Sequence, residues 1–448
     1  MERQTGMANV RKSLELFREC EKLVPGGTQL LSRRPSMFAF GVAPIFATHA
    51  KGARFWDVDG NEFIDLTGGI GAVLLGYADD EVDNACVEQL RKSTIFPILA
   101  PVELELAREL VQTIPCAEMV RLGKSGGEAD AVAVRMARGF TGRDRVAVCG
   151  YHGWHDWYIS ANLKADGALA EHLMPDVPTK GVPKALAGTA LPFAFNDIAS
   201  LEAVLRSAPG EFACVILEAA RFKQPQGTFL ADVVELAHRH GALVIFDEVV
   251  TGFRYAPGGA QEYFGVTPDL ATFGKAIANG YPLTAIVGRR DILQASAGMF
   301  ISSLYWDDNC TIAAGLACIR KLKRIHAPDI IRAMGTRYMQ GWLALAKKAG
   351  VPATLLGHPS VLSIKFEMDD PAIRSKATTL YSQEVNKRGV FGSAYFYCTA
   401  SHREPEIDAI LAAAEGALHV IGQALADGNI DKFLEVPAAK PLFSTRMV

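Results

Sequence analysis

The sequence lacks several features that would place it in other functional classes. Its eight cysteines include no CxxC pair and no cysteine and histidine spacing suited to zinc. No run of basic residues is present and the formal net charge is -3, so a nucleic-acid partner is not indicated. Internal repeats and low-complexity segments are also missing. We therefore expect a globular protein in a reducing, cytoplasmic compartment.

Long hydrophobic runs are missing as well. No apolar run approaches the roughly twenty residues that cross a bilayer, so we expect no membrane contact. Residues 1–23 are charged throughout, which favours a surface helix over a leader peptide. Hydrophobic residues make up 49% and charged residues 21% of the 448 positions, which suffices for one large domain and a smaller one.

The most informative stretch of the chain lies between residues 241 and 282. An apolar run at 242–246 ends on Asp247 and predicts a strand buried on both faces. A second run, at 269–273, is followed by Lys275. Open α/β sheets bind ligands at the carboxyl ends of their strands, so both charged residues are placed for chemistry.

Lys275 stands between Gly274 and Ala276, where desolvation disfavours its charged form. A neutral amine forms a Schiff base with an aldehyde, and pyridoxal phosphate is the common protein-bound aldehyde. Its ring nitrogen must stay protonated, and a buried acid such as Asp247 would keep that proton in place. The alternative is structural: an ion pair between the two residues, or a Lys275 side chain that reaches solvent.

The blocks DEVVTGFR (residues 247–254) and TFGKAIANGYP (residues 272–282) resemble the class III pyridoxal-phosphate-dependent aminotransferases. More narrowly they resemble the branch that includes glutamate-1-semialdehyde aminomutase. The resemblance implies that Asp247 contacts the pyridinium nitrogen, that Lys275 carries the cofactor, and that Val249 belongs to the cofactor site.

The same resemblance implies the α/β architecture called fold type I. We expect a large cofactor-binding domain at residues 76–333, with a mostly parallel seven-stranded sheet between helices. A small α+β domain would comprise residues 334–448, and an N-terminal segment, residues 1–75, would pack with it.

A phosphate site is predicted at Ser125, Gly126 and Gly127, ahead of a helix expected from about Glu128 to Phe140. Free N–H groups and the positive end of the helix dipole bind phosphate at such a position. Many members of the family have threonine where Gly127 stands, so one hydroxyl donor is lost here.

Three further side chains are expected near the cofactor. The resemblance implies that Tyr151 stacks on the pyridine ring, and His152 follows it, for which we favour a role in shaping the turn. Glu218 ends an apolar run at 214–217 and is expected to order the site. We interpret the nearby Trp154 and Trp157 as packing residues.

Members of the family are homodimers in which a threonine contacts the phosphate of the neighbouring subunit. Leu304 stands at that place here, and Ser302 and Ser303 are candidates to replace the threonine. With Gly127, two threonine hydroxyls are missing, so we expect a weaker hold on the cofactor phosphate.

For the substrate, the resemblance points to Arg33 as a carboxylate partner, since an arginine fork donates two parallel hydrogen bonds. A solvated surface arginine is an equal alternative. Residues 161–189 are loop-like and are either a lid over the site or a surface excursion.

We therefore predict an aminotransferase that moves an amino group from an amino acid or amine to a keto or aldehyde acceptor in ping-pong fashion. An aminomutase is the alternative, but Ala394 stands where aminomutases carry a gating glutamate. A catalytically impaired binding protein is a second alternative. Small-molecule substrates and a homodimer with sites at its interface are expected.

Overall fold

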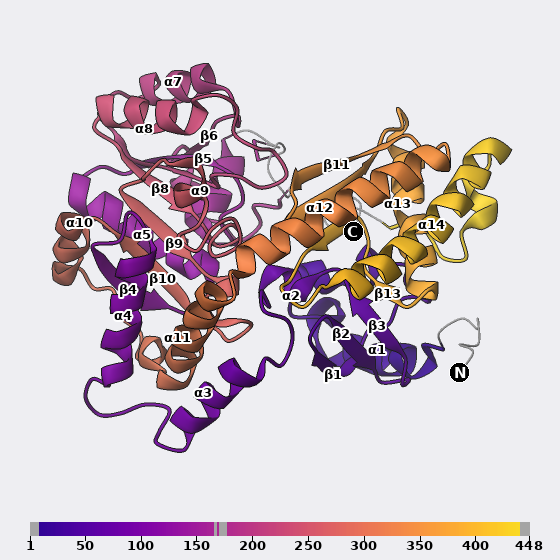
Figure 1. Cartoon of the computed structure of the whole chain (residues 1–448). Helices are drawn as coiled ribbons and strands as arrows, with labels where there is room; N and C mark the ends of the chain where they lie inside the picture. The colour runs from indigo at the N-terminus through magenta and orange to yellow at the C-terminus, as the bar shows by residue number, and fades with distance from the viewer. Residues whose placement is uncertain (1–8, 165–167, 170–176, 440–448) are drawn as a thin grey trace. The chain divides into compact units, whose positions relative to one another are not determined.

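The computed structural model describes residues 9–164, 168–169 and 177–439. The chain forms two compact units, shown in Figure 1. Of the described residues, 80–328 belong to the central unit, and 9–79 and 329–439 to the terminal unit. The terminal unit is therefore built from both ends of the chain.

The central unit is organised around a mixed sheet, in which its described residues form seven strands in the order β4-β10-β9-β8-β7-β5-β6. Strand β10 runs antiparallel to β4 and β9, whereas β9, β8, β7, β5 and β6 are parallel to one another. The predicted α/β fold with a mostly parallel sheet is confirmed. The strands are β4 (Met119–Gly123), β5 (Arg145–Cys149), β6 (Ala190–Pro192), β7 (Phe212–Leu217), β8 (Leu243–Asp247), β9 (Leu270–Phe273) and β10 (Thr284–Gly288).

Helices connect these strands and cover the sheet (Figure 1). The longer ones are α3 (Asp80–Leu90), α4 (Pro101–Thr113), α5 (Gly126–Thr141), α7 (Ile198–Arg206), α8 (Phe229–Arg239) and α11 (Asn309–Arg324). The short ones are α6 (Asp156–Ile159), α9 (Ala260–Phe264) and α10 (Arg290–Ala295), with single 3₁₀ turns η4 (Ser160–Leu163), η5 (Lys184–Leu186), η6 (Lys275–Ala278), η7 (Ser296–Gly298) and η8 (Leu304–Asp307).

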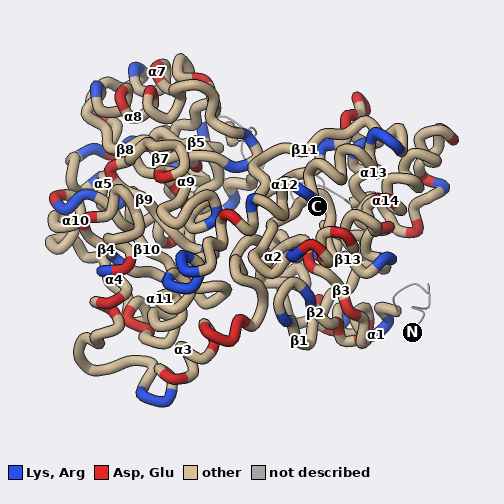
Figure 2. Tube along the Cα trace, viewed as in Figure 1, with Lys and Arg blue, Asp and Glu red and all other residues tan. Residues whose placement is uncertain are grey.

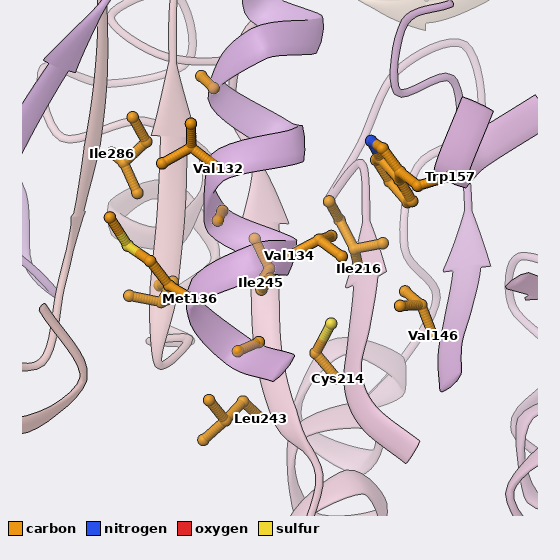
Figure 3. Packing of buried hydrophobic residues seen from close by; sticks show 14 of the residues in the cluster. Val132, Val134, Met136, Val146, Trp157, Cys214, Ile216, Leu243, Ile245 and Ile286 are labelled. Atoms are coloured by element: carbon orange, nitrogen blue, oxygen red, sulfur yellow. The ribbon is translucent and has the colours of Figure 1, made fainter. Parts of the chain in front are cut away.

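Helix α5 packs on one face of the sheet, and this packing sets which strand residues reach the site. Ile245 of β8 belongs to the buried cluster that includes Val134 and Met136 of α5 (Figure 3). Successive side chains of a strand point to opposite faces, so residues two apart share a face. Asp247, two residues beyond Ile245, therefore lies on the face that α5 covers. The same alternation places Thr272 with Leu270 on that face.

Helix α5 begins two residues earlier than the sequence indicates. Ser125 occupies the N-cap position with φ −128° and ψ 152°, and Gly126 is already helical. The Glu128 carboxylate accepts the backbone N–H of Lys124 at 2.7 Å, which stabilises this earlier start. The two glycines of the expected phosphate loop are thus the first turn of the helix itself.

The terminal unit contains two small sheets in its described residues, β1-β2-β3-β13 and β11-β12-β14. Strand β13, from the C-terminal part of the chain, pairs in parallel with β3 from the N-terminal part. Its strands are β1 (Ala47–Lys51), β2 (Arg54–Asp57), β3 (Glu62–Asp65), β11 (Ala353–His358), β12 (Val361–Phe366), β13 (Val390–Phe391) and β14 (Tyr395–Tyr397). Its helices are α1 (Arg11–Leu23), α2 (Gly68–Gly71), α12 (Ala327–Lys348), α13 (Pro371–Lys387) and α14 (Glu404–Asp427), with 3₁₀ turns η1 (Pro25–Gly27), η2 (Leu31–Arg33), η3 (Pro35–Met37) and η9 (Ile430–Phe433).

Helix α14 is long and apolar enough, by length and composition alone, to cross a membrane. No uninterrupted apolar run marks it in the sequence, because charged and polar residues break up the segment. In the structure α14 packs against α13, and Ile407, Ile410, Leu418 and Ile421 are buried on one side of it. Its apolar composition is therefore used in the core of the terminal unit.

Charges of both signs are interspersed along the trace (Figure 2). Within the central unit, α11 forms ion pairs with two neighbouring helices: Arg324 with Glu81 of α3 at 2.6 Å, and Lys323 with Glu109 of α4 at 2.8 Å. The pair of Arg324 with Glu81 is exposed, and an exposed pair contributes at most about 1 kcal/mol. Glu109 of the second pair is largely buried.

Candidate active site

Three neighbouring strands bring charged residues to one edge of the central sheet. Strands β7, β8 and β9 are parallel, with Leu217 opposite Phe246 and Asp247 opposite Thr272. Glu218, Asp247 and Lys275 therefore follow or end adjacent strands at the same edge. This is the edge at which open α/β sheets bind ligands.

Lys275 opens η6 in an uncommon backbone conformation, with φ +43° in the left-handed region. Its side chain is half-buried. Desolvation, and next the positive charge of Arg221, lower the pKa of the Lys275 amine to about 8, whereas Asp247 acts in the opposite direction. A part of the amine population is thus neutral near pH 7, which is the form required of a nucleophile.

Asp247 is 4% exposed and is held by two neighbours. Its Oδ1 accepts the backbone N–H of Val249 at 3.0 Å, and its Oδ2 lies 2.8 Å from Nδ1 of His152. His152 is fully buried. It therefore does more than shape its turn, because it fixes the orientation of the Asp247 carboxylate.

Glu218 links the segments around the site. Its Oε2 accepts the backbone N–H of Tyr151 at 3.0 Å, and its Oε1 lies 3.1 Å from Nη1 of Arg221. Burial raises the pKa of the Tyr151 phenol, which keeps the ring neutral. The ring of Tyr151 meets that of Tyr158 edge-on, with centroids 6.2 Å apart. Glu218 thus contacts both Tyr151 and Arg221, and its ordering role in the cofactor site stays a prediction.

The first turn of α5 lies against two other segments at very short range. A Cβ added to Gly126 would lie 3.0 Å from the side chain of Val249. One added to Gly127 would lie 3.0 Å from Nδ1 of His155, and one added to Gly153 would lie 2.8 Å from the Cα of Gly127. His155 therefore occupies the space that a threonine side chain at position 127 would need.

The described residues fit a pyridine ring with an aldehyde and a phosphate. Nε2 of His152 and Nδ1 of His155 are buried without a hydrogen-bond partner among the described residues. The first turn of α5 offers backbone N–H groups without intrahelical partners, the usual donors to a phosphate. Asp247 supplies an oriented carboxylate and Lys275 a desolvated amine. The donor set therefore matches pyridoxal phosphate, group by group.

The other predicted site residues lie in both units. Ser302, Ser303 and Leu304 are exposed around the start of η8, in the central unit. Arg33 ends η2 in the terminal unit. Ala394 is buried between β13 and β14 of the terminal unit.

Two interpretations need adjustment. Trp157 is buried in the core as expected, but Trp154 is 72% exposed and stacks on His155 with ring centroids 4.5 Å apart. The segment predicted to be either a lid or a surface excursion, residues 161–189, lies partly outside the described residues, which omit 165–167 and 170–176.

Four residues near the site were not predicted as functional: Asp130, His155, Arg221 and Thr272. Asp130 had a signal, because it is an acid on the otherwise apolar side of α5, beside Ala133, Val134 and Ala137. Thr272 is a polar residue within the apolar run of β9. Arg221 and His155 had no signal in the sequence that separates them from surface residues.

Asp130, His152 and Asp247 place ligand-type atoms within 4.8 Å of one another, the one such group found among the described residues. Three groups of this kind can hold a metal ion. Since Asp247 also suits a pyridinium nitrogen, we assign the cluster to an organic cofactor.

Comparison with known proteins identifies the family of the chain. The family described as aminotransferase class-III matches residues 37–427. The 3-aminobutyryl-CoA aminotransferase of Cloacimonas acidaminovorans (strain Evry) is 36% identical over 405 residues, covering 89% of this chain and 94% of that protein. The glutamate-1-semialdehyde 2,1-aminomutase of Syntrophobacter fumaroxidans (strain DSM 10017 / MPOB) is 33% identical over 423 residues, covering 90% and 96%.

Among solved structures, a β-phenylalanine aminotransferase from Variovorax paradoxus matches with a TM-score of 0.79 and 25% identity, covering 97% of this chain and 96% of that one. The predicted resemblance, fold type and cofactor are thus confirmed. The chain belongs to the class-III aminotransferases, which are pyridoxal-phosphate-dependent enzymes.

Proposed function

We propose that this aminotransferase takes as amino donor a β-amino acid or its thioester. The observation that carries the proposal is the 36% identity to a 3-aminobutyryl-CoA aminotransferase across most of both chains. A structural relative acts on β-phenylalanine. In both compounds the amino group is attached to the carbon β to the carboxyl carbon, which defines one substrate class.

The cofactor, when bound, withdraws electrons from the amino-bearing carbon of the substrate and carries the amino group to the acceptor. Lys275 would attach it through Nζ, and Asp247 would hold the proton on its ring nitrogen. Ser125, the N–H groups of Gly126 and Gly127, and the side chain of Val249 would surround the phosphate and the ring. Tyr151 would cover one face of the ring.

The chain's own residues also move protons. A Lys275 amine with a pKa of about 8 can take a proton from the amino-bearing carbon and return it, since general bases work best near the operating pH. Arg221 and Glu218 act on the pKa of this amine in opposite directions. The balance of these two charges would keep Lys275 usable as both base and acid.

An aminomutase is the second candidate, favoured by the 33% identity to a glutamate-1-semialdehyde aminomutase. Ala394 argues against an aminomutase, because aminomutases of this family carry a gating glutamate at that position and alanine has no carboxylate. The second alternative, an impaired binding protein, receives no support from the site. Lys275, Asp247 and the first turn of α5 retain the chemical groups that catalysis requires.

The visible spectrum of the purified holoenzyme tests the substrate class. We would add 3-aminobutyrate, 3-aminobutyryl-CoA, β-phenylalanine, L-alanine or glutamate-1-semialdehyde separately, without acceptor. Loss of the lysine-bound cofactor band with a β-amino compound, and slow or no loss with L-alanine, is the expected result. Conversion of glutamate-1-semialdehyde to an isomer without release of a keto product would instead establish the aminomutase.

A homodimer is also part of the proposal. Its support is a set of large apolar side chains that are exposed on the central unit, among them Ile98 and Leu99 (both 81% exposed) and Phe300 (88%). Exposed apolar side chains of this size commonly mark an interface. Ser302 and Ser303 follow Phe300 closely in the chain, so a partner packed there would meet the two proposed phosphate contacts.

Arg33 stays a proposed partner of a substrate carboxylate. Replacement of Arg33 by Gln should weaken the binding of a β-amino acid donor, seen as a higher KM, and should leave the KM of an uncharged amine unchanged. A KM of the β-amino acid equal to that of the wild type would exclude the role. We also propose a cytoplasmic location, which the eight free cysteines support.

A further inference from the structure

A second buried carboxyl group lies beside Asp247. Asp130, on the first turns of α5, is 2% exposed. Oxygens of Asp130 and Asp247 and a ring nitrogen of His152 all lie within 4.8 Å of one another. The chemistry proposed above uses Asp247 but gives Asp130 no part. The question is therefore which protonation state allows the Asp130 carboxyl group to be buried beside Asp247.

The hydrogen bonds divide unequally between the two carboxyl groups. Asp247 receives the N–H of Val249 at one oxygen and lies 2.8 Å from Nδ1 of His152 at the other. Asp130 receives one hydroxyl, from Oγ1 of Thr272, at its Oδ1 with a distance of 2.6 Å. Donors stabilise an ionised carboxylate, so Asp247 is the better placed of the two to carry a charge.

Two carboxylates this close cannot both ionise in a buried site, because neither has water to screen the other. The proton then stays on the group with fewer donors. We propose that Asp130 is a protonated, neutral acid that positions Asp247 and leaves it the single negative charge of the cluster. Since Oδ1 of Asp130 already accepts from Thr272, the proton belongs on its Oδ2.

Most of the surroundings act in the same direction, and the hydrogen bond from Thr272, which lowers the pKa of Asp130, is outweighed. Burial raises the pKa of the Asp130 carboxyl well above its usual range, and the negative charge of Asp247 is the next cause. Glu218, at the end of β7, adds a smaller contribution of the same sign, and Tyr151 lies within electrostatic range. His152 faces the pair from the segment after β5.

The functional consequence rests on the proposed role of Asp247 as partner of the ring nitrogen. A neutral Asp130 can donate its proton in a hydrogen bond to Asp247, and this bond stabilises the Asp247 carboxylate. A ring nitrogen would then meet one negative charge rather than two. The protonation of Asp130 itself does not depend on the cofactor, so it can be tested separately.

The test compares the apoprotein with its Asp130→Asn variant. An asparagine resembles the protonated acid, because its amide can donate to Asp247 while its oxygen accepts from Thr272. A carboxyl group whose pKa is higher in the folded state stabilises the fold at low pH, and this stability is lost as pH rises toward that folded pKa. The asparagine of the Asp130→Asn variant does not titrate, so the variant keeps this stability as the pH rises.

Melting temperatures of both proteins are measured between pH 5 and pH 9. The difference, variant minus wild type, should increase by roughly 1–3 °C per pH unit while Asp130 stays protonated in the folded state. Infrared spectra at pH 7 should show a carboxylic-acid C=O band that the variant lacks. A pH-independent difference together with no lost band would overturn the proposal.

Thr272→Val is the second variant, in case Asp130→Asn fails to fold. Removing the donor to Oδ1 should shift the carboxylic-acid band to higher frequency; an unchanged spectrum would contradict the assignment to Asp130. Affinity for pyridoxal phosphate is measured separately. We expect Asp130→Asn to bind within about twofold of wild type and Asp130→Ala about tenfold more weakly. If wild type and Asp130→Ala bind pyridoxal phosphate equally well while the wild type shows the carboxylic-acid band, Asp130 is protonated but has no effect on cofactor binding. That result would overturn only the proposed role toward the cofactor.

Discussion

Lys275 combines an uncommon backbone conformation with a depressed pKa. Its φ of +43° costs a non-glycine residue roughly 1–2 kcal/mol, which the surrounding structure must offset. The conformation directs the chain into η6 immediately after β9, so the amine lies at the strand end. The cost thus serves to position the reactive group.

The pKa of Lys275 leads to a pH prediction. Only the neutral amine attacks an aldehyde, so the rate of pyridoxal phosphate attachment to the apoprotein should rise with pH, with a midpoint at about 8. Stopped-flow absorbance between pH 6 and pH 10 measures this rate. Arg221→Gln removes a charge that lowers the pKa and should move the midpoint upward. A wild-type midpoint near the ordinary 10.5 would contradict the prediction.

His155 is a candidate to replace the threonine hydroxyl that the phosphate site lacks at position 127. Its Nδ1, which has no hydrogen-bond partner among the described residues, lies 3.0 Å from the place that a Cβ of residue 127 would take. His155→Ala should therefore weaken the binding of pyridoxal phosphate roughly tenfold, since a hydrogen bond to a charged group is lost. Fluorescence titration of the apoprotein measures the affinity, with His240→Ala as a control. If wild type and His155→Ala bind pyridoxal phosphate equally well, His155 does not compensate for the missing threonine hydroxyl.

At the scale of elements, the close approach of α5 and the segment after β5 depends on two glycines. Gly153 has φ +92° and would place a Cβ 2.8 Å from the Cα of Gly127. A side chain at Gly153 would require movement of the backbone, whereas one at Gly127 would first require the ring of His155 to shift. The absence of threonine at position 127 therefore coincides with tight packing as well as with a lost hydroxyl.

Because of this packing, we predict that replacing Gly127 by the threonine common in the family lowers the stability of the protein. Gly127→Thr should destabilise the central unit by about 1–3 kcal/mol, because the new Cβ would meet Nδ1 of His155 at 3.0 Å. Urea unfolding followed by fluorescence measures the change. Gly298→Thr is the matched control, since no atom of the part of the chain that the structure describes lies within 4 Å of a Cβ at Gly298. If Gly127→Thr is as stable as the control, α5 and the segment after β5 can move apart at no cost, and the prediction is wrong.

The sequence predicted these elements better than their contacts. The apolar runs at 242–246 and 269–273 became β8 and β9 with shifts of one residue, because strand burial is written into consecutive side chains. The start of α5 was predicted two residues late, since Gly126 and Gly127 have low helix propensity. The capping interaction of Glu128 overrides that preference.

At the scale of the whole molecule, the exposed apolar residues predict the assembly state. Replacing both Ile98 and Leu99 by Asp should convert a dimer into a monomer, because each charge would have to be buried at the interface. Light scattering coupled to size exclusion measures the mass. Ile373→Asp, a change at an exposed residue of the terminal unit, should leave the mass unchanged. A wild-type mass of one chain would refute the homodimer.

The sequence by itself determined the family and the cofactor, and it predicted the two residues on which the proposed chemistry depends. Desolvation of Lys275 and the position of Asp247 at a strand end are local properties, visible in the residues on either side. Only the tertiary structure decided which residues surround them. Asp130 and Thr272 are 142 positions apart, and His152 and Asp247 are 95 apart. Such contacts follow from strand order and helix packing, because the periodicity of one segment does not specify which other segment it will meet.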